Sequence, residues 1–219
     1  MTAIRVVAID GAAGSGKSTL ARGLARALGV PYVNTGVMYR ALTLAALEAG
    51  VDPTDEDALA GLMRGLRFGL SSGTPPELEV QGSVPGPELE SDLVEAWVST
   101  VASHPQVRSL MREAQRVLGT PDAVVEGRDI GTVVFPEAPV KLYLTAAPLT
   151  REERRVGERD EGEGSVRRSL RARDALDARV SPFEPAPGAM KIDTGDLSID
   201  RTLERALAIV RERLGEVPR

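Results

Sequence analysis

Residues 11–18 read Gly-Ala-Ala-Gly-Ser-Gly-Lys-Ser, which fits the pattern Gly-x-x-x-x-Gly-Lys-Ser/Thr at every fixed position. The preceding run, 4–9, is β-branched and apolar except for one arginine, which predicts a buried parallel strand. From residue 17 the apolar residues recur at spacings of three and four until Gly29, which predicts a helix that ends there. Strand, glycine-rich turn and helix form the context that a phosphate-binding loop (P-loop) requires.

The residue types in this loop match the chemistry of a polyphosphate. Glycines let successive backbone N–H groups turn toward one phosphate, and the following helix adds its free amides and the positive end of its dipole. We expect Lys17 to bridge the β- and γ-phosphates of a nucleoside triphosphate and the Ser18 hydroxyl to bind Mg²⁺. The expected ATP-binding residues of the loop are Gly11, Ala12, Ala13, Gly14, Ser15, Gly16, Lys17, Ser18 and Thr19.

The rest of the chain continues a strand–helix alternation. Such alternation is typical of an α/β fold, in which each helix returns the chain to a parallel sheet. We predict a doubly wound, five-stranded parallel sheet of the P-loop kinase type. The four further strands are expected at 31–34, 123–126, 140–145 and 189–193, and the other sheet-flanking helices at 36–49 and 199–214.

An insertion interrupts this alternation. Short segments at 66–70, 77–81 and 84–89, separated by Ser, Gly and Pro, predict a small antiparallel unit. Helices are expected over 90–102, with Trp97 in the core, and over 105–118. The charged, glycine-broken stretch after residue 150 predicts a short lid. The expected divisions are a P-loop core at 1–50, 104–150 and 166–219, an inserted acceptor-binding unit at 51–103, and a lid at 151–165.

Composition narrows the class of function. The chain has 219 residues, a net charge of −5 and a pI near 5.1, whereas nucleic-acid-binding surfaces usually carry a basic bias. It has no cysteine, which excludes disulfides and thiol chemistry. We find no apolar run of the roughly 18 residues that a membrane span needs. We therefore expect a cytoplasmic protein with no nucleic-acid or membrane partner. We also expect it to act as a monomer.

A P-loop alone leaves the phosphate acceptor open. GTP-dependent switches carry an Asn-Lys-x-Asp motif that reads guanine, and this sequence lacks that tetrapeptide. Arginines are concentrated between residues 151 and 179, which in an acidic protein indicates a small polyanionic ligand. These observations favour a kinase with a small acceptor. A kinase for uridylate or another metabolite and, less favoured, a GTP-dependent switch stay open as alternatives.

Three segments resemble those of bacterial cytidylate kinases, and the resemblance covers nearly the whole chain in order. Residues 35–40, Thr-Gly-Val-Met-Tyr-Arg, are similar to the family's Ser/Thr-Gly-x-x-Tyr-Arg segment. Residues 126–136, Glu-Gly-Arg-Asp-Ile-Gly-Thr-Val-Val-Phe-Pro, resemble its Gly-Arg-Asp-x-Gly-Thr-Val-Val-Phe-Pro signature. Residues 173–177, Arg-Asp-Ala-Leu-Asp, followed by Ser181-Pro182, are similar to its Arg-Asp-x-x-Asp stretch.

This resemblance implies an enzyme that transfers the γ-phosphoryl group of ATP to CMP or dCMP with Mg²⁺. It also implies roles for particular residues. Arg40 and Arg128 would hold the phosphate of the acceptor, and Ser99, Arg108 and Asp129 would read cytosine. Thr35 belongs to the same acceptor site. Arg173 and Asp177 would lie near the acceptor phosphate and sugar, Arg179 would reach the ribose, and Arg151, Arg154 and Arg155 would close over the donor. The expected catalytic residues are Lys17, Arg128, Arg154 and Arg155.

The chemistry of the base agrees with these implied roles. Cytosine carries an exocyclic amine beside acceptors at N3 and O2, so its site needs both an acceptor and a cationic donor. Asp129, Arg108 and Ser99 provide that complement. Uracil reverses the polarity at C4 and N3, which would set its carbonyl against Asp129 and leave polar groups unpaired.

Overall fold

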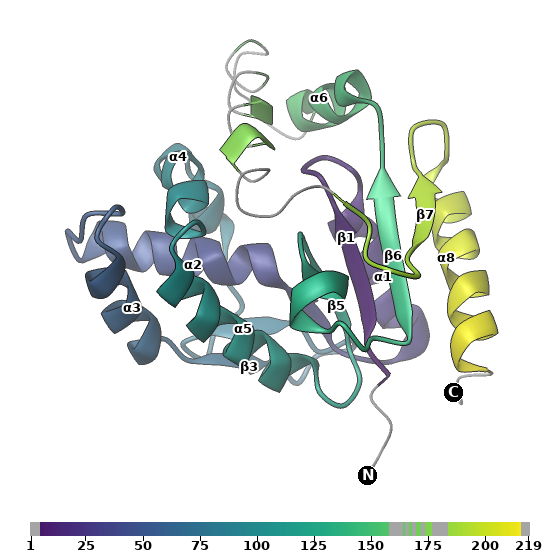
Figure 1. Ribbon diagram of the computed structural model, residues 1–219, viewed down its shortest axis with the longest axis horizontal. Coiled ribbons are helices and arrows are strands. Elements are labelled where there is room, and N and C mark those ends of the chain that lie inside the picture. Colours follow the sequence, from purple (N-terminus) through teal and green to yellow (C-terminus); the bar gives the residue numbers. More distant parts are fainter. Residues whose placement is uncertain are drawn as a thin grey trace.

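The computed structural model describes residues 5–157, 164, 167, 170, 171, 174–176 and 184–215 of the chain (Figure 1). In these residues, a parallel sheet carries helices and an inserted unit. The strands are β1 (Val7–Gly11), β2 (Tyr32–Asn34), β3 (Phe68–Leu70), β4 (Leu78–Val80), β5 (Val124–Gly127), β6 (Val140–Thr145) and β7 (Met190–Asp193). The helices are α1 (Lys17–Leu28), α2 (Thr35–Glu48), α3 (Glu56–Gly65), α4 (Asp92–Val101), α5 (Pro105–Gly119), α6 (Pro148–Gly157) and α8 (Ile199–Leu214), and the short helical turns are η1 (Pro87–Glu90) and η2 (Ile130–Val134).

The five-stranded sheet has the order β2-β5-β1-β6-β7, and every pairing in it is parallel. This confirms the predicted fold class. Strand β1 lies at the centre, where Val7 pairs with Val124 of β5 on one side and with Val140 of β6 on the other. Because parallel strands all end at the same edge, the loops that follow β1, β2 and β5 lie close together.

Alternation along β1 divides the core between the two faces of the sheet. Val7 and Ile9 pack with apolar residues of α1 and α8, including Leu24 and Val210. Val6 and Ala8 point to the opposite face and belong to a second cluster, which includes residues of α2 and α5. All four of these β1-region residues are buried, as a central parallel strand requires.

The insertion shares the second cluster with the sheet. Leu59, Met63 and Leu78 of the insertion pack in the same buried cluster as Val33 of β2 and Val125 of β5. Figure 1 shows α3, α4 and β3 on the side of the molecule away from β7 and α8. The division of the chain at residues 51 and 103 stays a proposal.

The structure differs from the prediction within this insertion. Helix α3 was not expected; it begins after Asp55, whose side chain accepts a hydrogen bond from the backbone N–H of Ala58, a standard N-cap. Only β3 and β4 form the antiparallel pair. The expected third segment, 84–89, instead leads into the turn η1, because prolines at 85 and 87 lack the N–H donors of a strand.

Trp97 was also assigned wrongly. The residue is 36% exposed, and the buried positions of α4 are instead Val94, Val98, Ser99 and Val101. Helical spacing identified the helix, but it did not indicate which face of the helix other elements would cover.

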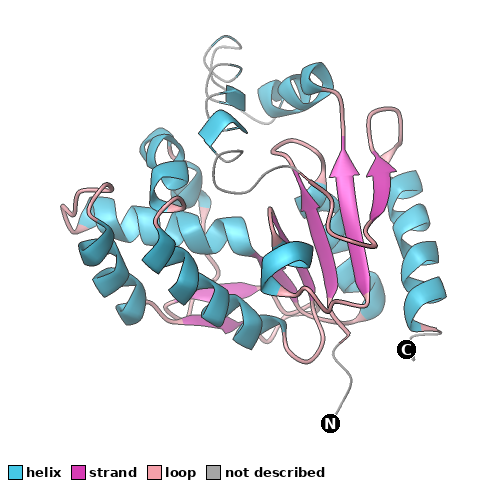
Figure 2. Ribbon diagram, in the orientation of Figure 1, coloured by secondary structure: helices cyan, strands magenta, loops and turns pink. Residues whose placement is uncertain are grey.

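Helix α6 lies beyond the edge at which the strands end, next to the loops that follow β1 and β7 (Figure 2). Helix α6 approaches the P-loop closely at Gly14, where an added Cβ would stand 2.9 Å from the backbone oxygen of Arg151. The predicted lid therefore begins in contact with the P-loop. Among the residues that the structure describes, none of the helices has the length and apolar character needed to cross a lipid bilayer.

Candidate active site

The P-loop joins the central strand to α1 at the carboxyl edge of the sheet. Gly14 and Gly16 have φ angles of +72° and +86°, a left-handed conformation that side chains other than glycine rarely adopt. Gly16 is the N-cap of α1, so the free amides of the first turn face the loop. Ser15 closes the loop internally by donating its hydroxyl to the Ala12 carbonyl at 2.9 Å.

Lys17 is held inside this loop. Its side chain is buried, and Nζ donates a hydrogen bond to the Ala12 carbonyl oxygen at 2.7 Å. Ser18 and Thr19 are exposed at the start of α1 and line the same cavity as Lys17. The arrangement presents a cation and hydroxyl groups together, which is what the phosphates of a nucleotide require.

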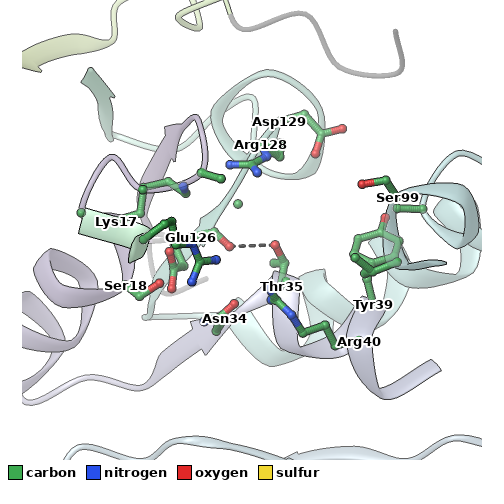
Figure 3. A pocket seen from close by; sticks show the side chains of 18 of the residues that line it. Lys17, Ser18, Asn34, Thr35, Tyr39, Arg40, Ser99, Glu126, Arg128 and Asp129 are labelled. Carbon is green, nitrogen blue, oxygen red and sulfur yellow. Dashed lines mark hydrogen bonds between the residues drawn. The ribbon is translucent and has the colours of Figure 1, made fainter. Parts of the chain in front are cut away.

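One cavity brings together the P-loop and most of the predicted acceptor residues. Figure 3 shows Lys17 and Ser18 on one side of it and Tyr39 and Ser99 on the other, with Arg128 between them. The predicted residues that line it are Ala13, Gly14, Gly16, Lys17, Ser18, Thr19, Thr35, Arg40, Ser99, Arg108, Arg128, Asp129 and Arg155. Residues that line it without having been predicted are Asn34, Gly36, Tyr39, Val98, Ala102, Glu126 and Gly127.

The loop after β5 is attached to the loops beside it. Thr35 donates its hydroxyl to the Glu126 carbonyl at 2.7 Å, and a Cβ on Gly127 would lie only 2.5 Å from the Thr35 hydroxyl oxygen (Figure 3). Arg128 donates a hydrogen bond from Nη1 to the Gly11 carbonyl at 2.7 Å. Glycine at 127 thus permits a close approach that places Arg128 directly beside the P-loop.

Asp129 and Arg108 form an ion pair at the far side of the cavity. The guanidinium of Arg108 donates from Nη2 to Asp129 Oδ2 and from Nη1 to the Ala102 carbonyl at 3.3 Å. The side chain of Arg108 is 12% exposed and that of Asp129 is 16% exposed, so both remain accessible to a ligand while being largely shielded from water. Ser99 of α4 is buried and lines the same end of the cavity.

Tyr39 and Arg40 of α2 form another wall. Burial raises the pKa of Tyr39 to about 12, so its phenol stays protonated at neutral pH. Arg40 donates from Nη2 to Glu95 Oε2 at 3.2 Å, which ties α2 to α4. The cavity therefore has a cationic rim whose arginines are partly engaged by carboxylates.

The lid arginines divide between two positions. Arg155 lines the cavity. Arg154 instead donates to the backbone oxygen of Thr194 at 2.5 Å and to its hydroxyl at 3.1 Å. Arg151 donates to the Ala13 carbonyl at 3.1 Å and forms an ion pair with Asp174 at 2.6 Å. Arg151 and Arg154 thus fasten α6 to the P-loop and to the end of β7.

Three predicted acceptor residues, Arg173, Asp177 and Arg179, lie outside the described residues, as does much of the predicted lid.

Two candidate functional residues, Glu126 and Glu95, were not predicted from the sequence. Glu126 lies near the end of β5, the buried strand next to β1. A single carboxylate after an apolar run was the signal in the sequence that could have identified it. Glu95 carried no such signal, because its contact with Arg40 joins positions 55 residues apart.

The donor set fits a magnesium ion. The Ser18 hydroxyl and the Glu126 carboxylate line the same cavity, and Mg²⁺ prefers such hard oxygen ligands. Glu126 is 2% exposed, and one of its oxygens accepts a hydrogen bond from the Tyr32 hydroxyl at 2.5 Å. Among the described residues, no cluster of three or more His, Cys, Asp or Glu side chains forms a protein-only metal site.

Comparison with known proteins identifies the relatives of this chain. Residues 7–212 match the model of the cytidylate kinase family. A cytidylate kinase of Deinococcus deserti is 47% identical over 199 residues, covering 90% of this chain and 95% of that protein. One from Deinococcus radiodurans is 45% identical, covering 97% and 98%. An uncharacterized protein from Eubacterium ventriosum has a similar fold, with a TM-score of 0.53 at 12% identity, covering 95% of this chain and 99% of that one.

Proposed function

The chain belongs to the cytidylate kinase family, and on this basis we propose that it transfers the γ-phosphoryl group of ATP to CMP or dCMP, giving ADP and CDP or dCDP. The observation that carries the proposal is the shared cavity. Lys17 and Ser18 line it at one end, and the Arg108–Asp129 pair lines it at the other. A donor phosphate and an acceptor base can therefore occupy the two ends together.

The donor end would hold the phosphates of ATP. Lys17 and the amides at the start of α1 would bind them, with Arg155 closing from α6. Ser18, together with Glu126, would hold Mg²⁺, which when bound neutralises phosphate charge. Arg151 and Arg154 would act in the lid, as their contacts to Ala13 and Thr194 support.

The acceptor end would hold CMP. Arg40 and Arg128 would bind its phosphate, and Thr35 stands between them at the cavity wall. Asp129 would accept a hydrogen bond from the cytosine amine, while Arg108 and Ser99 would address the ring acceptors. Arg173, Asp177 and Arg179 keep their proposed roles at the phosphate and sugar by resemblance.

This arrangement would need no protein nucleophile. The acceptor phosphate is already ionised at neutral pH, so the residues have to align it with the donor and neutralise charge. We further propose a monomeric, cytoplasmic enzyme. One chain lines both the donor and the acceptor end of the cavity, so the proposed site needs no residue from a second copy. The location is supported by the substrates, which are intracellular metabolites.

The test is turnover of a panel of nucleoside monophosphates with ATP and Mg²⁺. We expect kcat/KM for CMP and dCMP to exceed that for UMP by at least about tenfold, because a site built around polar groups rejects a base that leaves them unpaired. Equal turnover of UMP would contradict cytosine selection and favour the uridylate alternative.

Asp129→Asn tests the reading of the base. An amide can donate as well as accept, so the penalty against the uracil carbonyl should fall. We expect the CMP-to-UMP ratio of kcat/KM to narrow by about tenfold, or about 1.4 kcal/mol. The matched control is Asp122→Asn, which removes the same charge from a surface pair with Arg5 and should leave the ratio unchanged. An unchanged ratio in Asp129→Asn would mean that other groups read the base.

A further inference from the structure

Asp10 is a buried carboxylate immediately before the P-loop. It lies on the central strand and is 4% exposed. Its two oxygens accept hydrogen bonds from two consecutive backbone amides, that of Ile130 at 2.7 Å and that of Gly131 at 2.8 Å. These amides begin the turn η2, which follows Asp129 directly.

The loop is shaped to receive this carboxylate. A Cβ on Gly131 would stand 3.2 Å from Asp10 Oδ2 and 3.3 Å from Ala186 Cβ, so a side chain there would require its neighbours to give way by a few tenths of an ångström. On the other side of Asp129, Arg128 is attached to Gly11 by its 2.7 Å hydrogen bond. Residues on both sides of Asp129 are therefore fastened to the two consecutive residues Asp10 and Gly11.

A carboxyl group at position 10 is costly to bury, yet it matches the two backbone N–H groups that it faces. Burial raises the pKa of the Asp10 carboxyl above its usual range, although the two backbone hydrogen bonds and the charge of Lys17 act in the opposite direction. Only a carboxylate presents two acceptor oxygens to two adjacent N–H groups. Because this side chain is costly to bury but matched to both amides, we infer that the contact fixes the position of the turn η2 relative to β1.

We propose that Asp10 is a positioning residue, which holds the Arg128–Asp129 loop at a fixed distance from the P-loop and so aligns the acceptor with the donor. This inference rests on the proposed function, because it is that function which places Arg128 and Asp129 against the acceptor nucleotide. Phosphoryl transfer is sensitive to this alignment, since a misplacement of about 1 Å can lower a rate by about 100-fold.

Asp10→Asn tests the role directly. The amide oxygen can accept from one of the two N–H groups, but the amide nitrogen would face the other one. We expect kcat/KM for CMP to fall at least about tenfold, while the Kd for ATP, measured without acceptor, changes less than about threefold. Asp55→Asn is the matched control: this carboxylate also accepts a backbone N–H, at 3.0 Å, but it is exposed at the start of α3 and does not line the cavity, so its replacement should leave kcat/KM unchanged.

A double-mutant cycle separates positioning from a merely structural effect. If Asp10 acts through the Arg128–Asp129 loop, then Asp10→Asn should lower kcat/KM by a smaller factor when Arg128 is already alanine than it does in the wild-type protein. Independent, multiplicative losses would overturn the proposal, and so would equal losses of ATP binding and CMP turnover or an Asp10→Asn enzyme with wild-type kinetics.

Gly131→Ala makes the same test without removing the carboxylate. It crowds the contact from the other side, and it replaces Asp10→Asn in the cycle if that variant fails to fold. Turnover of CMP by the wild-type protein is measured first. Its absence would refute the proposed function, whereas wild-type turnover together with unaffected variants would overturn only the role of Asp10.

Discussion

Gly127→Ala tests whether the close packing at the end of β5 is as tight as the structure indicates. The added Cβ would lie 2.5 Å from the Thr35 hydroxyl oxygen and 2.7 Å from Ile130 Cδ1, both nearer than real contacts permit. Neither neighbour can move easily, because Thr35 and Ile130 are 4% and 1% exposed and Thr35 is held by its hydrogen bond to Glu126.

The expected cost follows from these contacts. Overpacking a buried site costs about 1–3 kcal/mol, and loss of the Thr35 hydrogen bond would add about 1 kcal/mol. We therefore expect the free energy of unfolding to fall by about 2–4 kcal/mol. Because Arg128 follows directly, kcat/KM for CMP should fall as well.

Urea denaturation measures this change through the midpoint and the slope of the transition. Gly61→Ala is the matched control, since an added Cβ there meets nothing within 4 Å and the residue lies inside α3. It should stabilise the protein by about 0.5–1 kcal/mol, as alanine does in helices. A Gly127→Ala protein as stable as the wild type would refute the packing argument.

Three further predictions concern the charges around the site. Lys17→Ala should lower kcat at least about 100-fold with an unchanged circular dichroism spectrum, because a contact to transition-state charge is lost; residual activity above a tenth would contradict this. Replacing Arg154 and Arg155 together should lower kcat much more than it weakens CMP binding, measured by calorimetry; equal losses would assign them to the acceptor site. The pKa of Glu152 is lowered from 4.5, first by its hydrogen bonds to Arg171, so its stabilising contribution is present above that value and is lost as pH falls through the folded-state pKa. Acid titration of the unfolding midpoint should therefore show a step that Glu152→Gln abolishes, and a step that persists would exclude this pair.

Patterns that are local in the chain were readable from the sequence alone. The P-loop, its strand and its helix occupy one continuous stretch, and each residue type there follows from the phosphate that the loop would bind. Strands β5 and β6 were predicted within one residue at each end, because each is a short run in which valine, leucine and other apolar residues predominate, as in a sheet covered on both faces. Lys17 and Ser18 needed no partner from elsewhere to be identified.

Contacts between distant positions required the tertiary structure. Asp10 meets Gly131 across 121 residues, and Arg40 meets Glu95 across 55. Periodicity does not encode such pairs, because each partner looks like an ordinary charge or glycine in its own segment. The same limit explains Trp97, whose helix was predicted but whose exposed face depended on which neighbours packed against α4. Local chemistry thus sufficed to predict the class of ligand, a polyphosphate. Only the packing of separate loops decided how the acceptor residues are held beside the P-loop.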